Sequence, residues 1–147
     1  MLQKTRNVSI EYVSHALLPA EAVRRAVIGV LDGEKTGAAD INVIFLSGQR
    51  MRALNRRTFG SDRATDVIAF ALPHPGQVVG DVYVCPSVAR RAAGRLGVPE
   101  REELVRLVIH GTLHVLGYDH PAGEDRTVSI MWRLQERYVS RATKGEM

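Results

Sequence analysis

The sequence predicts an α+β fold in a single domain, with about four strands in a mixed sheet and about five helices. The 147 residues suit one domain with one hydrophobic core, expected to cover positions 1–147. Apolar residues make up 45% of the chain, and they alternate in short segments or recur at helical spacing in longer ones. Two strand-like segments are adjacent, which is typical of a hairpin rather than of strands that alternate strictly with helices.

The first half of the chain alternates between strand and helix. Apolar and polar residues alternate over Asn7–Val13, which predicts a half-buried strand. A proline suits the first turn of a helix, and an apolar face follows it over Pro19–Leu31. Asp40–Leu46 is rich in Ile, Val and Phe and predicts the most regular strand. Ser47 can then cap a helix over Gly48–Arg57.

The second half begins with two strands and continues with three helices. Thr65–Leu72 and Val78–Cys85 are rich in strand-forming residues, and prolines and a glycine separate them as in a hairpin. A helix is predicted over Ser87–Leu96, ending before a glycine. Another helix runs from Pro99–Leu116, and the last covers roughly Glu124–Thr143.

Charge and cysteine content narrow the class of protein. The formal net charge of +4 suits an anionic partner, with nucleic acid the first candidate. The single cysteine excludes an intramolecular disulfide and fits a reducing cytoplasm, the location we expect. No apolar run approaches the roughly 20 residues that span a bilayer, so no membrane segment is predicted.

The segment 110–120, HGTLHVLGYDH, carries the clearest chemical signal. His110 and His114 lie four residues apart, so a helix places both imidazoles on one face, where they can share a tetrahedral metal ion. Gly117 can end that helix in the left-handed conformation, and the reversal can bring His120 back to the pair. Three neutral nitrogens with an open fourth position are typical of catalytic zinc. We therefore predict one Zn²⁺ per chain at the end of this helix. Another metal ion that binds imidazole is the alternative.

The same spacing occurs in the zinc-peptidase signature of the metzincins. That signature has a glutamate after the first histidine, and this residue acts as the general base. This chain has Gly111 there instead, which argues against peptide hydrolysis by that mechanism. A metzincin-like peptidase or hydrolase stays an alternative. A non-catalytic ribosome-assembly factor with a structural zinc is the other alternative.

The motif HGTLHVLGYDH resembles H-G-x-L-H-x-x-G-Y-D-H of the YbeY family, the bacterial rRNA maturation endoribonucleases. Three further segments agree with the family: TDVIAF after Leu54 and Asn55, GDVYVC, and MWRLQE. The resemblance spans about Ile41 to Glu136 and rests mainly on the highly specific histidine motif.

The resemblance implies an α+β fold, one zinc ion and hydrolytic cleavage of single-stranded RNA. It further implies roles in maturing the 3′ end of 16S rRNA and in ribosome quality control, with ribosomal RNA and the small ribosomal subunit as partners. The family's three metal ligands match His110, His114 and His120. The attacking nucleophile, water or the ribose 2′-hydroxyl, stays open, as do further catalytic residues and the oligomeric state.

One departure from the family concerns a candidate phosphate contact. Many members place an arginine before the glycine of the loop that precedes the T-D-V strand, and Phe59 stands there in this chain. Arg56, Arg57 and Arg63 are close in sequence and are candidate substitutes, although they can equally be solvated surface residues. Asp119 lies beside a predicted ligand and can either orient a histidine or cap the turn.

Overall fold

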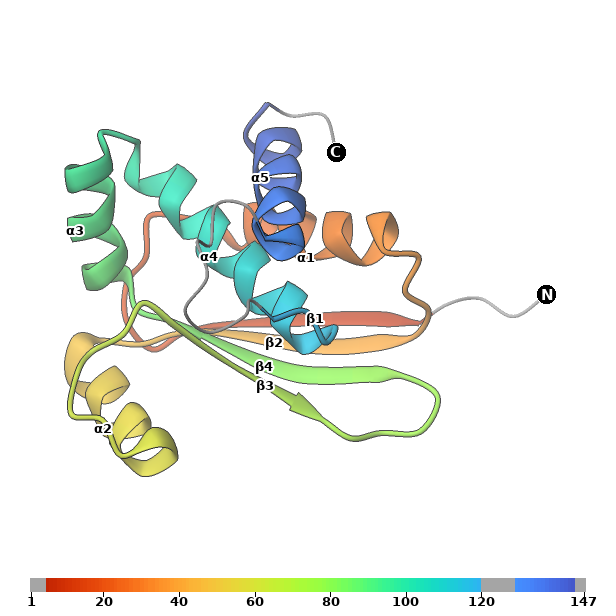
Figure 1. Ribbon diagram of the computed structural model, residues 1–147, viewed down its shortest axis with the longest axis horizontal. Helices are drawn as coiled ribbons and strands as arrows, with labels where there is room; N and C mark the ends of the chain where they lie inside the picture. The colour runs from red at the N-terminus through yellow and green to blue at the C-terminus, as the bar shows by residue number, and fades with distance from the viewer. Residues whose placement is uncertain (1–4, 120–128, 145–147) are drawn as a thin grey trace.

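The described part of the chain folds around one four-stranded mixed sheet, shown in Figure 1. The computed structural model describes residues 5–119 and 129–144. The order across the sheet is β1-β2-β4-β3, in which β1 and β4 flank β2 in parallel and β3 pairs antiparallel with β4. The strands are β1 (Arg6–Tyr12), β2 (Ala39–Phe45), β3 (Val67–Leu72) and β4 (Val78–Val84). The predicted mixed sheet and its hairpin are confirmed.

The predicted α+β class is also confirmed, because five helices accompany the sheet within residues 5–119 and 129–144. They are α1 (Ala20–Gly33), α2 (Gly48–Phe59), α3 (Pro86–Leu96), α4 (Glu100–Val115) and α5 (Ile130–Thr143). Figure 1 shows α1, α4 and α5 together on one side of the sheet and α2 beyond its other side. The helix α4 packs on β3 and β4 and also contacts α1, α3 and α5, so it is the central helix of the fold.

The helix α5 begins directly after a serine that caps it. The Ser129 side chain accepts a hydrogen bond from the Trp132 N–H at 3.0 Å and caps the helix, which starts at Ile130. The predicted start at Glu124 falls within 120–128, outside the described residues.

Two glycines allow α4 to lie close against the sheet. A Cβ atom at Gly111 would be 2.4 Å from Val82 Cγ1, and one at Gly80 would be 2.5 Å from Val115 Cγ1. Protein interiors are packed closely enough that such contacts exclude even a methyl group. The main core therefore forms between this helix layer and one face of the sheet; its largest buried side chains include Phe45, Ile41, Leu104, Ile109 and Leu113.

The opposite sheet face carries polar side chains. The Asn42 amide donates a hydrogen bond to Asp81 Oδ1 at 2.9 Å across β2 and β4, and Glu11 lies on the same shallow surface. A second small core, made by Met51, Ile68 and Cys85, anchors α2 at one end. None of the described helices is long and apolar enough to cross a membrane.

Candidate metal centre and adjoining groove

Two histidines project from α4 toward each other. Ten residues of this helix, among them Leu104, Ile109 and Leu113, are buried, whereas His110 and His114 are half-buried. Their Nε2 atoms lie 3.1 Å apart, and their ring centroids are separated by 4.6 Å. The four-residue spacing thus produces the convergent pair that the sequence predicted.

The separation of the two nitrogens fits a shared metal ion. Nitrogen ligands bind zinc at about 2.0–2.1 Å, so two ligands of one tetrahedral ion lie roughly 3.3 Å apart. The observed 3.1 Å between His110 and His114 is close to this value. The third predicted ligand, His120, lies outside the described residues, so the full ligand set stays a prediction.

A glutamine from α5 fixes the orientation of His110. The Gln135 side chain is 3% exposed, and its Oε1 atom lies 2.6 Å from His110 Nδ1. Its Nε2 donates to the Glu136 carboxylate at 3.0 Å, which sets the direction of the amide group. An amide oxygen can only accept, so His110 Nδ1 carries the hydrogen and Nε2 keeps the lone pair that a metal needs.

An arginine holds the far end of this chain of contacts. Arg106 donates from Nε and Nη2 to the two carboxylate oxygens of Glu136 at 2.8 and 3.0 Å, and from Nη1 to Glu103 at 2.9 Å. Burial by itself would raise the pKa of Glu136, but the hydrogen bonds from Arg106 and Gln135 outweigh it and lower that pKa. At Glu103, burial outweighs the hydrogen bond from Arg106 and raises the pKa.

The chain turns sharply after α4, as predicted from the motif. Gly117 has a φ of 103°, and its N–H donates to the His114 carbonyl at 2.9 Å. The next residue, Tyr118, donates its hydroxyl to Glu34 Oε1 at 2.5 Å, and Tyr138 donates to Glu34 Oε2 at 2.5 Å. The end of α1 therefore anchors both the turn that leads toward His120 and the helix α5.

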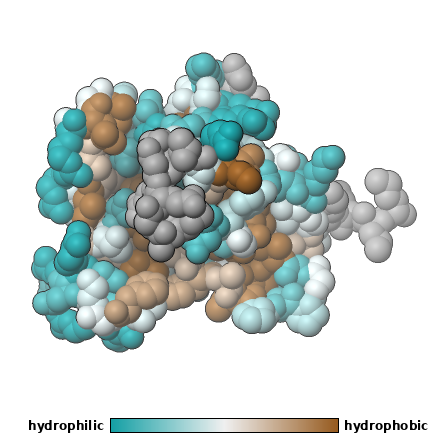
Figure 2. All heavy atoms as spheres, in the orientation of Figure 1, coloured by the Kyte–Doolittle hydropathy of each residue, from teal (hydrophilic) through white to brown (hydrophobic). Residues whose placement is uncertain are grey.

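A groove of about 380 Å³ lies beside the histidine pair. The edge strand β3 forms one wall, the end of α2 another, and α4 presents the imidazoles. Figure 2 shows hydrophobic side chains where Figure 1 draws β3, next to hydrophilic atoms over α2. The residues lining this groove are Asn55, Phe59, Thr65, Val67, Ile68, Ala69, His110, His114 and Asp119.

A smaller pocket adjoins His110 on the side of α5. Its volume is about 130 Å³, and Asp66, Trp132 and Gln135 are among its lining residues. Asp81, by contrast, lies on the opposite face of the sheet, hydrogen-bonded to Asn42. Of Asp66, directly before β3, and Asp81 in β4, only Asp66 lies near the histidines.

The three predicted arginine contacts lie around the end of α2. Arg56 forms an ion pair with Asp62 and lowers the pKa of that carboxyl through hydrogen bonding and charge. Arg57 is exposed in the last turn of α2, and the backbone carbonyl of Arg63 accepts from Asn55 Nδ2 at 2.8 Å. None of the three is among the described residues that line the groove. Their role in substrate binding stays a prediction.

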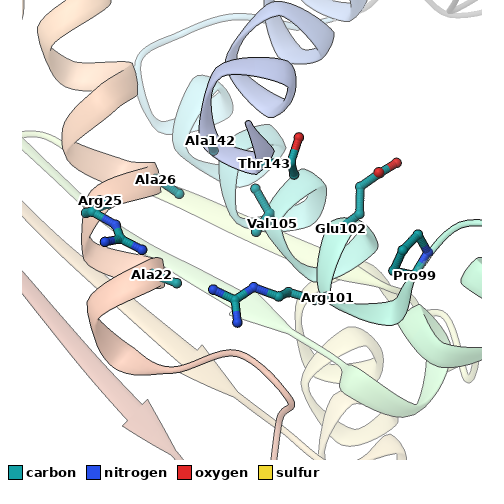
Figure 3. Close-up of a pocket in the computed structure, with 9 residues that line it drawn as sticks. All are labelled: Ala22, Arg25, Ala26, Pro99, Arg101, Glu102, Val105, Ala142 and Thr143. Carbon is teal, nitrogen blue, oxygen red and sulfur yellow. The ribbon is translucent and has the colours of Figure 1, made fainter. Parts of the chain in front are cut away.

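A separate hollow of about 390 Å³ lies between α1, α4 and α5. Figure 3 shows Arg25 from α1 and Arg101 from α4 extending toward one another across it. Its described lining residues include no histidine, so this hollow lacks the chemistry of the metal centre.

Three residues of the site, Gln135, Glu136 and Arg106, were not predicted from the sequence. Gln135 lies 25 positions from His110, and no local spacing pattern connects the two residues. The available signal was the agreement of MWRLQE with the family, which pointed to this helix without assigning a role to its glutamine.

Comparisons with known proteins identify the family. The family model described as Endoribonuclease YbeY matches residues 8–143. A protein named Endoribonuclease YbeY from Persephonella marina is 32% identical over 83% of this chain and 87% of its own length. One of the same name from Thermus thermophilus is 35% identical over 80% of this chain and 87% of its own length.

A solved structure agrees with this assignment. The solution structure of TM1509 from Thermotoga maritima superposes with a TM-score of 0.66 at 30% identity, covering 95% of this chain and 90% of that one. A protein named Endoribonuclease YbeY from the same species is 38% identical over 72% of this chain and 69% of its own length. The chain therefore belongs to the YbeY family, as its histidine motif indicated.

Proposed function

We propose that this protein is a zinc-dependent endoribonuclease that cleaves single-stranded RNA. Family membership supports the endoribonuclease class. The observation that carries the metal-dependent part is the 3.1 Å approach of His110 Nε2 to His114 Nε2, with the tautomer of His110 set by Gln135. His110, His114 and the predicted ligand His120 would hold the ion. When bound, zinc would supply Lewis acidity that polarises a phosphoryl oxygen and makes water more acidic.

The groove offers the groups that would position an RNA strand. The Cys85 N–H donates to the Asp66 carbonyl at 2.9 Å, so the alternation of an antiparallel pair turns the backbone groups of Val67 and Ala69 away from β4. Both residues line the groove, where an N–H can donate to a phosphate oxygen or to a ribose hydroxyl. Asp119 is the carboxylate among the described lining residues and can accept a proton there.

The packing of Gly111 argues against a peptidase. A zincin-type general base would need a glutamate side chain at this position. Even a Cβ atom there would be 2.4 Å from Val82 Cγ1 and 3.3 Å from Val67 Cγ2. The helix would have to move off the sheet to admit that side chain. The open groove beside the histidines likewise favours catalysis over a purely structural zinc.

The decisive experiment uses a hairpin RNA with a long unpaired tail and protein purified without a histidine tag. Elemental analysis should find about one zinc per chain, and cuts should fall in the tail and loop. His114→Ala should lose both the metal and the cleavage. Cutting that persists in this variant, or equal cutting within the stem, would refute the proposal.

We further propose that the physiological substrate is ribosomal RNA, at the 3′ end of 16S rRNA in the small subunit, with a role in ribosome quality control. The basic net charge and the family resemblance support this assignment. Small subunits that carry a 3′-extended 16S precursor should be trimmed faster than an unrelated RNA of equal length. Equal rates on the two substrates would contradict a ribosomal specificity.

A further inference from the structure

An exposed aromatic ring stands at the groove that contains the histidine pair. Phe59 is the last residue of α2 and is 64% exposed, although phenylalanine is among the most frequently buried residues. Single exposed apolar side chains are common on protein surfaces, so exposure alone indicates nothing. The position is informative, because Phe59, His110 and His114 line the same groove.

The backbone that carries this ring is fixed by contacts that do not involve the ring. Gly60, at a φ of 71°, ends α2 and donates its N–H to the Arg56 carbonyl at 3.0 Å. Asn55 is 7% exposed and ties α2 to the following loop by donating to the Arg63 carbonyl at 2.8 Å. The ring is therefore presented to the groove from a well-anchored helix end.

Core packing does not account for the ring. Among the described residues, α2 enters the second core through Met51 and Leu54, and Phe59 is not part of that cluster. A small polar side chain at position 59 would avoid exposing a large apolar surface to water. The ring is thus available to a partner with a flat aromatic face.

We propose that Phe59 stacks on an unpaired nucleobase of the RNA, next to the phosphate that lies at His110 and His114. This inference rests on the RNA-cleaving function proposed above and adds a base-binding position to it. Aromatic side chains stack on any base, because every base has a π-face. The position would therefore accept all four bases.

Stacking also supplies a reason for selectivity toward single strands. Bases within a duplex are already stacked and paired, so an aromatic ring cannot reach their faces. An unpaired base can rotate out and place its face on Phe59 while its phosphate stays in the groove. Preference for unpaired RNA would then come from this ring as well as from the shape of the groove.

The test compares side chains at position 59 on a short unpaired RNA and on the same RNA with an abasic nucleotide beside the cleavage site. Phe59→Ala should raise KM about tenfold, equivalent to ~1.4 kcal/mol, with little change in kcat. Phe59→Trp should keep the wild-type KM, whereas Phe59→Leu, which keeps apolar volume without a π-face, should resemble alanine. On the abasic RNA, the wild type and Phe59→Ala should have the same KM.

Two further variants separate stacking from charge effects and from a general response to surface mutation. Phe59→Arg replaces the ring by a charge and should increase the dependence of binding on salt by about one phosphate contact. Leu96→Ala, at a residue that is 63% exposed on α3 and outside the groove, is the matched control and should leave KM unchanged.

The outcomes distinguish this inference from the proposed function. If the wild type cleaves RNA but Phe59→Ala has an unchanged KM, or if its tenfold loss persists on the abasic RNA, stacking is wrong and the endoribonuclease proposal stands. If Phe59→Leu has the wild-type KM, apolar contact explains the role of Phe59 and the stacking proposal is wrong. If the metal-loaded wild type neither binds nor cleaves unpaired RNA, both proposals fail together.

Discussion

Replacing Gln135 should weaken metal binding, because this residue orients His110. Gln135→Leu keeps the side chain close in volume but removes the acceptor that lies 2.6 Å from His110 Nδ1. Loss of such an outer contact typically lowers metal affinity 10- to 100-fold. That range corresponds to about 1.4–2.8 kcal/mol. This free energy agrees with the ~1–3 kcal/mol cost of removing the partner of a buried hydrogen-bond donor. We expect a cost of this kind at position 135, because the Gln135 side chain is 3% exposed.

Competition with a chromogenic chelator would measure the zinc dissociation constant directly. Gln135→Leu should raise this dissociation constant 10- to 100-fold, and Gln77→Leu in the β3–β4 turn, away from the histidines, is the control, with no change expected. Thermal unfolding of the metal-free proteins should show that Gln135→Leu still folds. A dissociation constant within twofold of the wild type, in a folded variant, would refute the role assigned to Gln135.

Three other predictions concern the surroundings of the site. Gly111→Ala should destabilise the fold by about 1–3 kcal/mol, because the new methyl group meets Val82, and denaturant unfolding would measure the loss. Glu34→Gln should cost about 1.5–3 kcal/mol in the same assay, since two tyrosine hydroxyls donate to this carboxylate. The contribution of Glu136 to the free energy of unfolding should be lost as the pH drops through and below about 4.5, because the hydrogen bonds from Arg106 and Gln135 hold its pKa below the ordinary 4.5 despite burial. Glu136→Gln should lose part of this acid dependence.

Specific results would contradict these three expectations. In the background of Val82→Ala, the cost of Gly111→Ala should shrink, because the contacting methyl groups are gone. An equal cost in both backgrounds would mean that the close approach of α4 is not the cause. Unchanged stability of Glu34→Gln would show that the tyrosine hydrogen bonds do not anchor the turn. An identical acid profile in Glu136→Gln would assign the pH dependence to other carboxyls.

The elements of the fold were largely predictable because their signals are local. The first strand was predicted over Asn7–Val13 and is found at Arg6–Tyr12, and the hairpin follows from turn residues between two strand-like segments. The parallel pairing of β1 with β2 and of β2 with β4 was not assigned. Strand order depends on contacts between distant segments, which alternation and capping residues do not encode. The acidic pair Glu124 and Asp125 resembled a first helical turn, and that predicted start lies outside the described residues, whereas the Ser129 cap of α5 was not predicted.

The residues of the site were likewise predictable where their signals are local. His110, His114 and the turn at Gly117 were predicted, because a four-residue helical spacing and a helix-ending glycine are local features. The contact of Gln135 with His110 was not predicted, because it depends on the packing of α5 against α4. Phe59 stood out in sequence as a departure from the family pattern. Its place beside the histidines became evident only when α2, β3 and α4 were seen to enclose one groove.

The tight seating of α4 on the sheet also limits what mutation can make of this site. Two histidines at helical spacing are shared with zinc peptidases, so a single glycine-to-glutamate change would complete their motif on paper. Here that change would place the new Cβ atom 2.4 Å from Val82 Cγ1, with a charged side chain to accommodate beyond it. Acquiring the peptidase base would first require a smaller residue in β4 or a lifted helix, and either step costs core packing before any new activity appears. A single codon change therefore separates the two motifs in sequence, whereas in the folded protein that change would first cost stability.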